Sequence, residues 1–217
     1  MSFYSKAQRQ CQDQFDSRPM ADAMESAIIT DTLSEPQQAF ISTRDFFFLS
    51  TVNAAGEPTV SHKGGAVGTV KVLDDRTLAF PAYDGNGMFL SMGNIQDTAR
   101  IGLLFMDFET PNRLRVQATA SIAAEDALLA QYPGALAVVR ARVDAVFVNC
   151  ARYIHKYQRV ESSPYVPDAT GAAPQPQWKR IDAMQPVLSQ ADRDRTTAAG
   201  GTISEQEYGA ALLRGES

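Results

Sequence analysis

The chain has little cysteine, little histidine and no long apolar run. Its two cysteines, Cys11 and Cys150, are too few for a disulfide framework or a metal cluster, so we expect a reducing, cytoplasmic setting and no metal site. No stretch of about 18 apolar residues is present, and we therefore expect no membrane-spanning helix. The first residues open no apolar segment, so no secretory signal is expected.

Basic residues are also in short supply. The chain has 20 lysines and arginines against 25 aspartates and glutamates, a formal net charge of −5. This balance argues against a broad nucleic-acid surface, although it leaves room for a local basic pocket. The sequence also lacks a G-x-S-x-G elbow, a P-loop and a paired-carboxylate motif, so none of these motifs indicates a chemistry.

What is present is the composition of a globular protein, with 217 residues of which 44% are apolar. We expect a helical arm over residues 1–34, a β-rich domain over 35–158, and a loop with a helical tail over 159–217. The arm carries an apolar stripe that includes Met20, Met24, Ile28 and Ile29. Further short helices are expected at 36–43, 125–131 and 149–156.

Aromatic and β-branched residues predict strands, separated by turns that contain glycine, proline and asparagine. The expected strands cover residues 46–52, 59–63, 67–73, 77–80, 101–108, 113–122 and 137–148. They are linked by hairpins and do not alternate regularly with helices. This pattern favours a mainly β fold of the α+β class, an antiparallel barrel of about six strands, over a doubly wound sheet.

One candidate site segment is Ser61-His62-Lys63-Gly64-Gly65, where the second expected strand ends. Lys63 can pair with a phosphate, or lie beside the edge of a flavin ring where negative charge develops on reduction. Gly64 and Gly65 permit a planar ring to stack against the backbone. The alternative is a strand end with a solvated lysine and a glycine bulge.

A second candidate segment is the loop that begins with Asp84, Gly85, Asn86 and Gly87. A helix is expected to start near Gly87 with Asn86 or Asp84 as its cap. Unpaired N–H groups at such a helix N-terminus favour a phosphate. In this helix Met88 belongs to the apolar face, and Ser91 and Asn94 lie on a neighbouring face. The alternative is a loop with a capped helix and no ligand.

Other residue types give weaker signals. Arg113 and Arg115 share the polar face of one strand and can add positive charge for a phosphate, although exposed strand arginines are commoner. Cys150 and His155 can form a reactive pair, but an inert buried cysteine is favoured. No side chain stands out as a catalytic acid or base.

The order of these segments resembles the pyridoxamine 5′-phosphate oxidase-like flavoproteins, which are FMN-binding split β-barrels and usually homodimers with FMN at the subunit interface. The resemblance covers Glu35 to Lys156. Residues 149–154, Asn-Cys-Ala-Arg-Tyr-Ile, also resemble an Asn-Cys-Pro-x-Tyr-Ile segment of one branch, with Ala151 in place of proline. Each match is only moderately specific, and the resemblance depends on their shared order and spacing.

The resemblance assigns site residues by region. Ser61, His62, Lys63 and Gly64 would line the ring or ribityl part of FMN. Asp84, Asn86, Gly87, Met88, Ser91 and Asn94 would lie near the phosphate and the ribityl chain. Arg113 or Arg115 would come from the partner chain of the homodimer.

By the same resemblance, the protein is expected to be an FMN-dependent oxidoreductase acting on an unidentified small molecule. Oxidation of vitamin B6 is disfavoured, because the chain lacks the Arg-Leu-His-Asp-Arg segment that reads that substrate in the oxidase. Two alternatives remain open: the same barrel binding the deazaflavin F420 or haem, and a non-catalytic module that binds or senses flavin. Neither a nucleic acid nor a membrane is expected as a partner.

Overall fold

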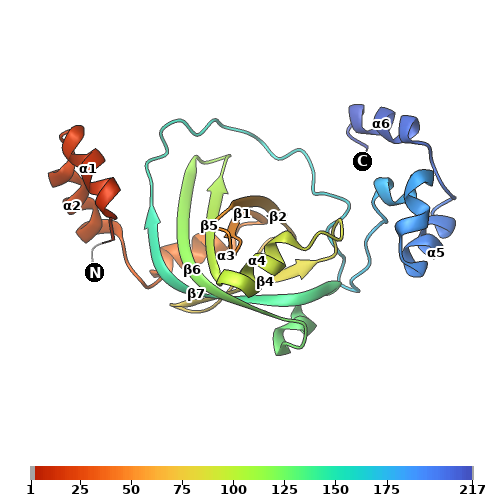
Figure 1. Ribbon diagram of the computed structural model, residues 1–217, viewed down its shortest axis with the longest axis horizontal. Coiled ribbons are helices and arrows are strands. Elements are labelled where there is room, and N and C mark those ends of the chain that lie inside the picture. Colours follow the sequence, from red (N-terminus) through yellow and green to blue (C-terminus); the bar gives the residue numbers. More distant parts are fainter. Residues whose placement is uncertain (1–2, 217) are drawn as a thin grey trace. The chain divides into compact units, whose positions relative to one another are not determined.

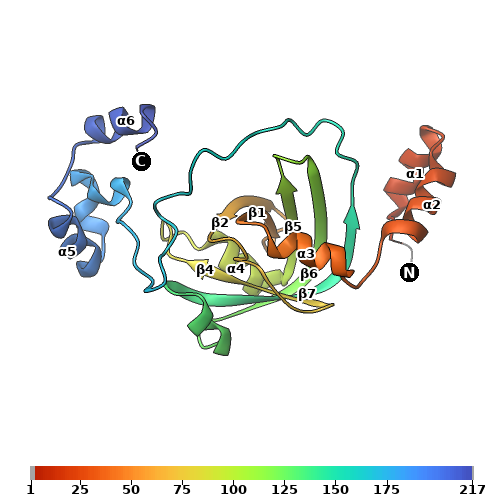
Figure 2. The same ribbon diagram turned by 180° about the vertical axis from the view of Figure 1, so that it is seen from behind.

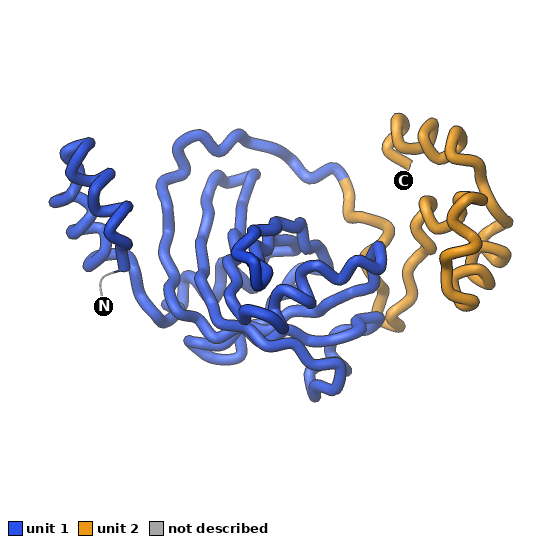
Figure 3. The backbone as a smooth tube through the Cα atoms, in the orientation of Figure 1, with its two compact units in different colours: residues 1–160 blue, residues 161–217 orange. Residues whose placement is uncertain are grey.

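The computed structural model describes residues 3–216 (Figure 1). The chain divides into two compact units, residues 1–160 and 161–217 (Figure 3). Among the residues described, no helix has the length and apolar character needed to cross a membrane.

The first unit is built on one antiparallel sheet with the strand order β2-β1-β5-β6-β7-β4-β3. Its long strands β6 and β7 are strongly curved (Figures 1 and 2). The strands are β1 (Phe46–Val52), β2 (Pro58–Gly64), β3 (Lys71–Asp74), β4 (Thr77–Tyr83), β5 (Arg100–Asp107), β6 (Asn112–Ala123) and β7 (Ala135–Val148). The α+β split-barrel class is confirmed. The sheet has seven strands rather than about six, and each of the seven overlaps one of the expected strand segments.

Alternation along the strands separates an inner, apolar face of the sheet from an outer face. In β1, Phe47, Leu49 and Thr51 are buried, whereas Phe46 and the other residues between them are only partly covered. This is the period of two that a strand with one core-facing side requires. The largest fully buried side chains include Phe47, Phe80, Phe105, Ile41, Leu49 and Leu78.

Several helices accompany the sheet in the first unit. They are α1 (Lys6–Gln14), α2 (Arg18–Ile28), α3 (Glu35–Ser42), α4 (Leu90–Thr98) and the 3₁₀ helix η1 (Ala127–Gln131). The arm formed by α1 and α2 is joined to the sheet by a β-bridge between Thr30 and Val146. The aromatic rings of Phe3 and Phe147 also meet edge to face, with centroids 5.6 Å apart.

Two expected elements differ from the structure. Strand β3 begins at Lys71 rather than residue 67, because Gly68 has a left-handed φ of 77° that interrupts extended chain. The helix expected at 149–156 is absent, and Tyr153 there has φ 70°, which a right-handed helix cannot contain. Instead, the segment 149–160 is irregular and is held to the barrel where the Tyr157 N–H donates to the Phe108 carbonyl, 3.1 Å away.

The second unit contains η2 (Gln177–Arg180), η3 (Asp182–Val187), α5 (Gln190–Ala198) and α6 (Glu205–Leu213). Within its described residues, Ile181 is the one buried apolar side chain. Polar contacts take the place of a larger core: buried Lys179 forms an ion pair with Asp192 at 3.0 Å, and buried Thr196 donates to the Lys179 carbonyl at 3.3 Å. This unit therefore depends on specific hydrogen bonds more than on apolar burial.

Candidate functional site

Three polar contacts fix α4 against β1 and β2. The Thr98 hydroxyl donates to the Val52 carbonyl at 2.8 Å. The Asn94 amide donates to the Thr51 hydroxyl at 3.0 Å, with both side chains buried. The hydroxyls of Ser61 and Ser91 are 3.0 Å apart. The last contact joins the two candidate segments, which are 30 residues apart in the sequence.

These contacts also set the direction of the helix. Along β2, Pro58 pairs with Val52, Ser61 with Leu49, and Lys63 with Phe47. The α4 contacts follow the same order, from the C-terminal end of the helix beside Val52 to its first turn beside Ser61. The helix therefore runs antiparallel to β2, and its positive N-terminal end is directed toward the part of the strand that carries Lys63.

Lys63 is the cation of this arrangement. It pairs across the sheet with Phe47, a core residue, so its side chain belongs to the same inner face as Ser61. The side chain is half-buried, and the described residues offer it no hydrogen bond or ion pair. Burial lowers the pKa of Lys63 below its ordinary value, since removal from water disfavours the charged form. A partly desolvated ammonium without a counter-ion is suited to bind an anion.

The start of α4 differs from the expected one. The helix begins at Leu90, with Phe89 as its N-cap residue at φ 49°, and Gly87 also has a left-handed φ of 77°. Asn86 does not cap the helix; its side-chain oxygen accepts from the Met88 N–H at 3.1 Å and closes a turn inside the loop. The helix begins only after Gly87 and Phe89, because neither left-handed residue can belong to a right-handed helical turn. The unpaired helix N–H groups are therefore near Ser91 rather than Gly87.

The structure separates the remaining predicted residues by face. His62 lies on the outer face, where its ring stacks on Phe46 at 5.4 Å between centroids. Arg115 pairs with Leu104, which in turn pairs with Phe48, so it shares that outer face, and Arg113 lies two residues before it. Within one chain, His62 and both arginines are therefore on the opposite side of the sheet from Lys63.

The loop residues and Asn94 also differ in their surroundings. Asp84, Asn86, Gly87 and Met88 are all exposed in the loop that precedes α4. Asn94 is buried and bonded to Thr51, so its visible role is to hold the helix. At Gly64 a Cβ atom would come within 3.1 Å of the His62 ring, which makes this position tight for any larger residue.

Sequence reasoning missed Thr51 and Thr98, which anchor α4. Thr51 is the one polar residue among the inward positions of β1, and this interruption of the pattern was the available signal. Thr98 gives no such signal, because its partner is a backbone carbonyl that any residue could offer. Both residues hold α4, which carries Ser91, in place against β1.

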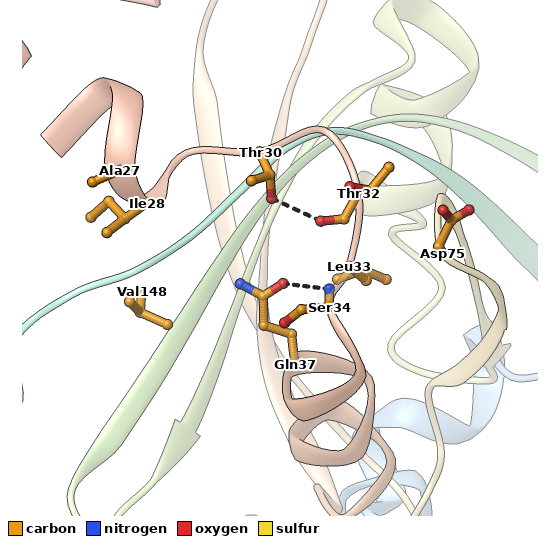
Figure 4. Close-up of a pocket in the computed structure, with 9 residues that line it drawn as sticks. All are labelled: Ala27, Ile28, Thr30, Thr32, Leu33, Ser34, Gln37, Asp75 and Val148. Atoms are coloured by element: carbon orange, nitrogen blue, oxygen red, sulfur yellow. Dashed lines mark hydrogen bonds between the residues drawn. The ribbon is translucent and has the colours of Figure 1, made fainter.

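A pocket of about 370 Å³ lies at the junction of the arm and the barrel (Figure 4). Its lining comes from the end of α2, the linker to α3, the start of α3, Asp75 and Val148. None of the predicted site residues is among these. Two hydrogen bonds are drawn there: the Thr30 hydroxyl donates to the Thr32 carbonyl at 2.8 Å, and the Ser34 N–H donates to Gln37 Oε1 at 2.9 Å. The pocket is therefore separate from the candidate cofactor site.

Comparison with known proteins places the chain in a family. Residues 33–164, more than half of the chain, match the family described as pyridoxamine 5′-phosphate oxidase. No protein with curated annotation matches the chain.

Similar solved structures include one from Lactobacillus delbrueckii, provisionally assigned as a pyridoxamine 5′-phosphate oxidase, with 28% identity, coverage of 54% of this chain and 95% of that one, and a TM-score of 0.45. An FMN-binding protein from Syntrophomonas wolfei has 12% identity, 65% and 96% coverage, and a TM-score of 0.41. The haem storage protein HutZ from Vibrio cholerae has 19% identity, 54% and 94% coverage, and a TM-score of 0.40. From the extent of the family match, the chain belongs to the pyridoxamine 5′-phosphate oxidase family.

Proposed function

We propose that this protein binds FMN and acts as an FMN-dependent oxidoreductase on a small molecule. The observation that carries the proposal is the convergence of an unpaired, half-buried ammonium, a pair of hydroxyls and a helix N-terminus. Each of these groups donates to anions. Family membership supplies the expectation of a flavin, and this geometry supports a phosphorylated one.

The residues present fit the group. Lys63 would hold negative charge, either on the phosphate or at the ring edge, and Ser61 and Ser91 would donate to phosphate oxygens. The left-handed backbone at Gly87 and Phe89 keeps the loop before α4 clear of a regular helix, so N–H groups stay available. When bound, FMN supplies a ring that accepts and releases hydride. The chain's own residues bind and orient it.

A second copy of the chain would complete the site. The outer face of the sheet carries Phe46, Phe48 and Leu104 partly exposed, and Arg115 lies in the same row. An apolar sheet face of this kind requires cover. Arg113 Nε is buried and finds no acceptor among the described residues. We infer that the arginines of one copy serve the Lys63 side of the other.

The visible spectrum of the purified protein tests the proposal. A yellow protein with flavin bands near about 370 and 450 nm, whose extracted ligand has the mass of FMN, is the expected result. If the extracted ligand is F420 or haem, the proposed cofactor is wrong and the corresponding alternative is correct. A colourless protein that binds none of the three when they are added would refute the proposal.

Turnover needs its own measurement. Mixing the FMN-bound protein with NADH or NADPH in a stopped-flow instrument should bleach the 450 nm band. No nicotinamide fingerprint is present in the sequence, so the donor is expected to bind only transiently over the flavin. Flavin that is bound but reduced by neither donor would favour the non-catalytic role.

A further inference from the structure

The helix α2 carries an apolar stripe that the described chain leaves uncovered. Met20, Ala23, Met24 and Ala27 follow the i, i+3, i+4, i+7 spacing of one helix face, and all four are exposed. Met20 is 64% exposed and Met24 is 43% exposed. A helix with this pattern normally packs its apolar face against another element.

The other face of α2 is already occupied by the arm itself. Arg9 of α1 pairs with Glu25 at 3.1 Å and also with Asp22, while Arg18 is bonded to Asp13. These are all the charged side chains of α2, and they lie on the side turned away from the stripe. The charged face of α2 therefore contacts α1, and the apolar stripe lies on the opposite, exposed face.

The stripe has the properties of a surface that docks on its own copy. Identical copies bring identical charges, so a face without charged side chains avoids like-charge contacts when it docks on its own copy. The four residues of the stripe carry no charge. A like-charge penalty is therefore absent when two copies meet.

Side-chain sizes are also self-complementary. If two α2 helices pack antiparallel about a two-fold axis between positions 23 and 24, Met20 faces Ala27 of the other copy and Met24 faces Ala23. Each large side chain then meets a small one, which lets two helices approach closely and interlock. A parallel pairing would instead set methionine against methionine and alanine against alanine.

We propose that α2 is a dimerisation element that packs antiparallel on α2 of a second copy. Two methionines and two alanines alone cannot supply the roughly 800 Å² per partner of a standard interface. The inference therefore rests on the dimer proposed above, which it extends to residues outside the part that matches the family. Continuity supports this: Phe3 of the arm packs on Phe147, which pairs with Arg115 and so belongs to the outer face of the sheet.

Cysteine cross-linking tests the proposal directly. In a chain carrying Cys11→Ser and Cys150→Ser, Ala23→Cys should form a disulfide-linked dimer on mild oxidation, because positions 23 and 24 of the two copies lie together. Ser26→Cys, exposed on the same helix but outside the stripe, is the matched control and should cross-link at least tenfold more slowly. Equal rates for the two variants, or no cross-link for Ala23→Cys, would overturn the inference.

A charge substitution gives a second readout that does not depend on oxidation. Met24→Glu should raise the dimer dissociation constant at least tenfold in sedimentation, whereas Ser26→Glu should leave it nearly unchanged. A dimer unaffected by Met24→Glu would show that the stripe is covered by another part of the chain or by a different protein. Flavin content is measured separately from the visible spectrum. A colourless protein that still cross-links at position 23 would support this inference and contradict the FMN proposal.

Discussion

Single residues decide the electrostatics and the strain of the candidate site. Lys63 and His62 are neighbours in the sequence but lie on opposite faces of β2, so only the lysine joins Ser61 and Ser91. Strand alternation makes this division predictable from sequence alone. The left-handed backbone of Phe89 and Ala99 was not predictable, because neither residue type favours that conformation and each is held there by its surroundings.

Flavin affinity should fall as pH rises through the pKa of Lys63. Burial places that pKa below the ordinary lysine value, and only the charged form attracts a phosphate. Titrating FMN into the protein between pH 7 and pH 10, by quenching of flavin fluorescence, should show weaker binding at the alkaline end. Lys63→Met should weaken binding about tenfold or more at pH 7 and flatten the profile. Lys6→Met, in the arm, is the control.

The same shift has a consequence for stability without ligand. The folded lysine has a lower pKa than the unfolded one, so the unfolded chain binds more protons between the two values. Stability of the apo-protein should therefore rise with pH across that window, opposite to the trend in FMN affinity. Urea midpoints of Lys63→Met that rise with pH as steeply as those of the parent protein would contradict this assignment.

Ala99 offers a test of local strain. It ends α4 at φ 57°, where glycine loses nothing by lacking a Cβ atom. Ala99→Gly should stabilise the protein by up to about 1 kcal/mol in urea unfolding. Ala39→Gly, within α3, should instead destabilise it by roughly the same amount. Loss of stability in both variants would mean that Ala99 is not strained.

At the scale of elements, the sequence predicted strands better than the segments around them. Strand β1 has the expected bounds of 46–52, because its apolar and polar positions alternate under one buried face. The predicted start of α4 near Gly87 and the predicted helix at 149–156 were wrong. Left-handed residues in both segments, and a hydrogen bond from Tyr157 to Phe108 in the second, determine their conformation. The approach of Ser91 to Ser61 also needed the structure, because it depends on how α4 lies across two strands.

The buried pair of Thr51 and Asn94 should act as a unit. Replacing one partner leaves the other buried without a hydrogen bond, so Asn94→Leu and Thr51→Val should each cost about 1–3 kcal/mol of unfolding free energy. The double variant should cost clearly less than the sum. Each single change should also weaken FMN binding, because it loosens the helix that carries Ser91. Additive costs would argue against a direct pair.

At the scale of the whole molecule, the two units depend on different forces. The first has a large apolar core, and the second is held by a buried ion pair and side-chain hydrogen bonds. Trp178, the only tryptophan of the chain, lies in the second unit beside Lys179. Its fluorescence therefore reports on that unit, whereas bound flavin reports on the first.

Removing one member of the buried ion pair should unfold the second unit selectively. Lys179→Met leaves Asp192 without its partner and should cost about 3 kcal/mol. The urea midpoint followed by Trp178 fluorescence should fall, while the flavin spectrum stays unchanged. Arg214→Met, which breaks an exposed ion pair with Glu216, should shift neither signal. A flavin band that disappears together with the Trp178 transition would show that the two units fold as one.

Subunit mixing tests whether a site is shared between copies. Lys63→Ala and Arg115→Ala chains should each bind FMN poorly as homodimers. In a mixed dimer, one site carries both changes and the other carries neither, so mixing should restore tight binding to about half of the sites in mixed dimers. Without any recovery after mixing, Lys63 and Arg115 would belong to one chain's site or to no common site.

The paired hydroxyls of Ser61 and Ser91 give the site a property of its own. Either oxygen can be the donor to the other, so a small rotation decides which hydroxyl directs its proton outward. Whichever way that bond runs, one proton of the pair stays free to donate to an anion. Rotation of the two hydroxyls therefore moves this donor between two oxygens 3.0 Å apart without moving any backbone atom. A ligand oxygen that lies nearer to either serine can thus be met by the same pair.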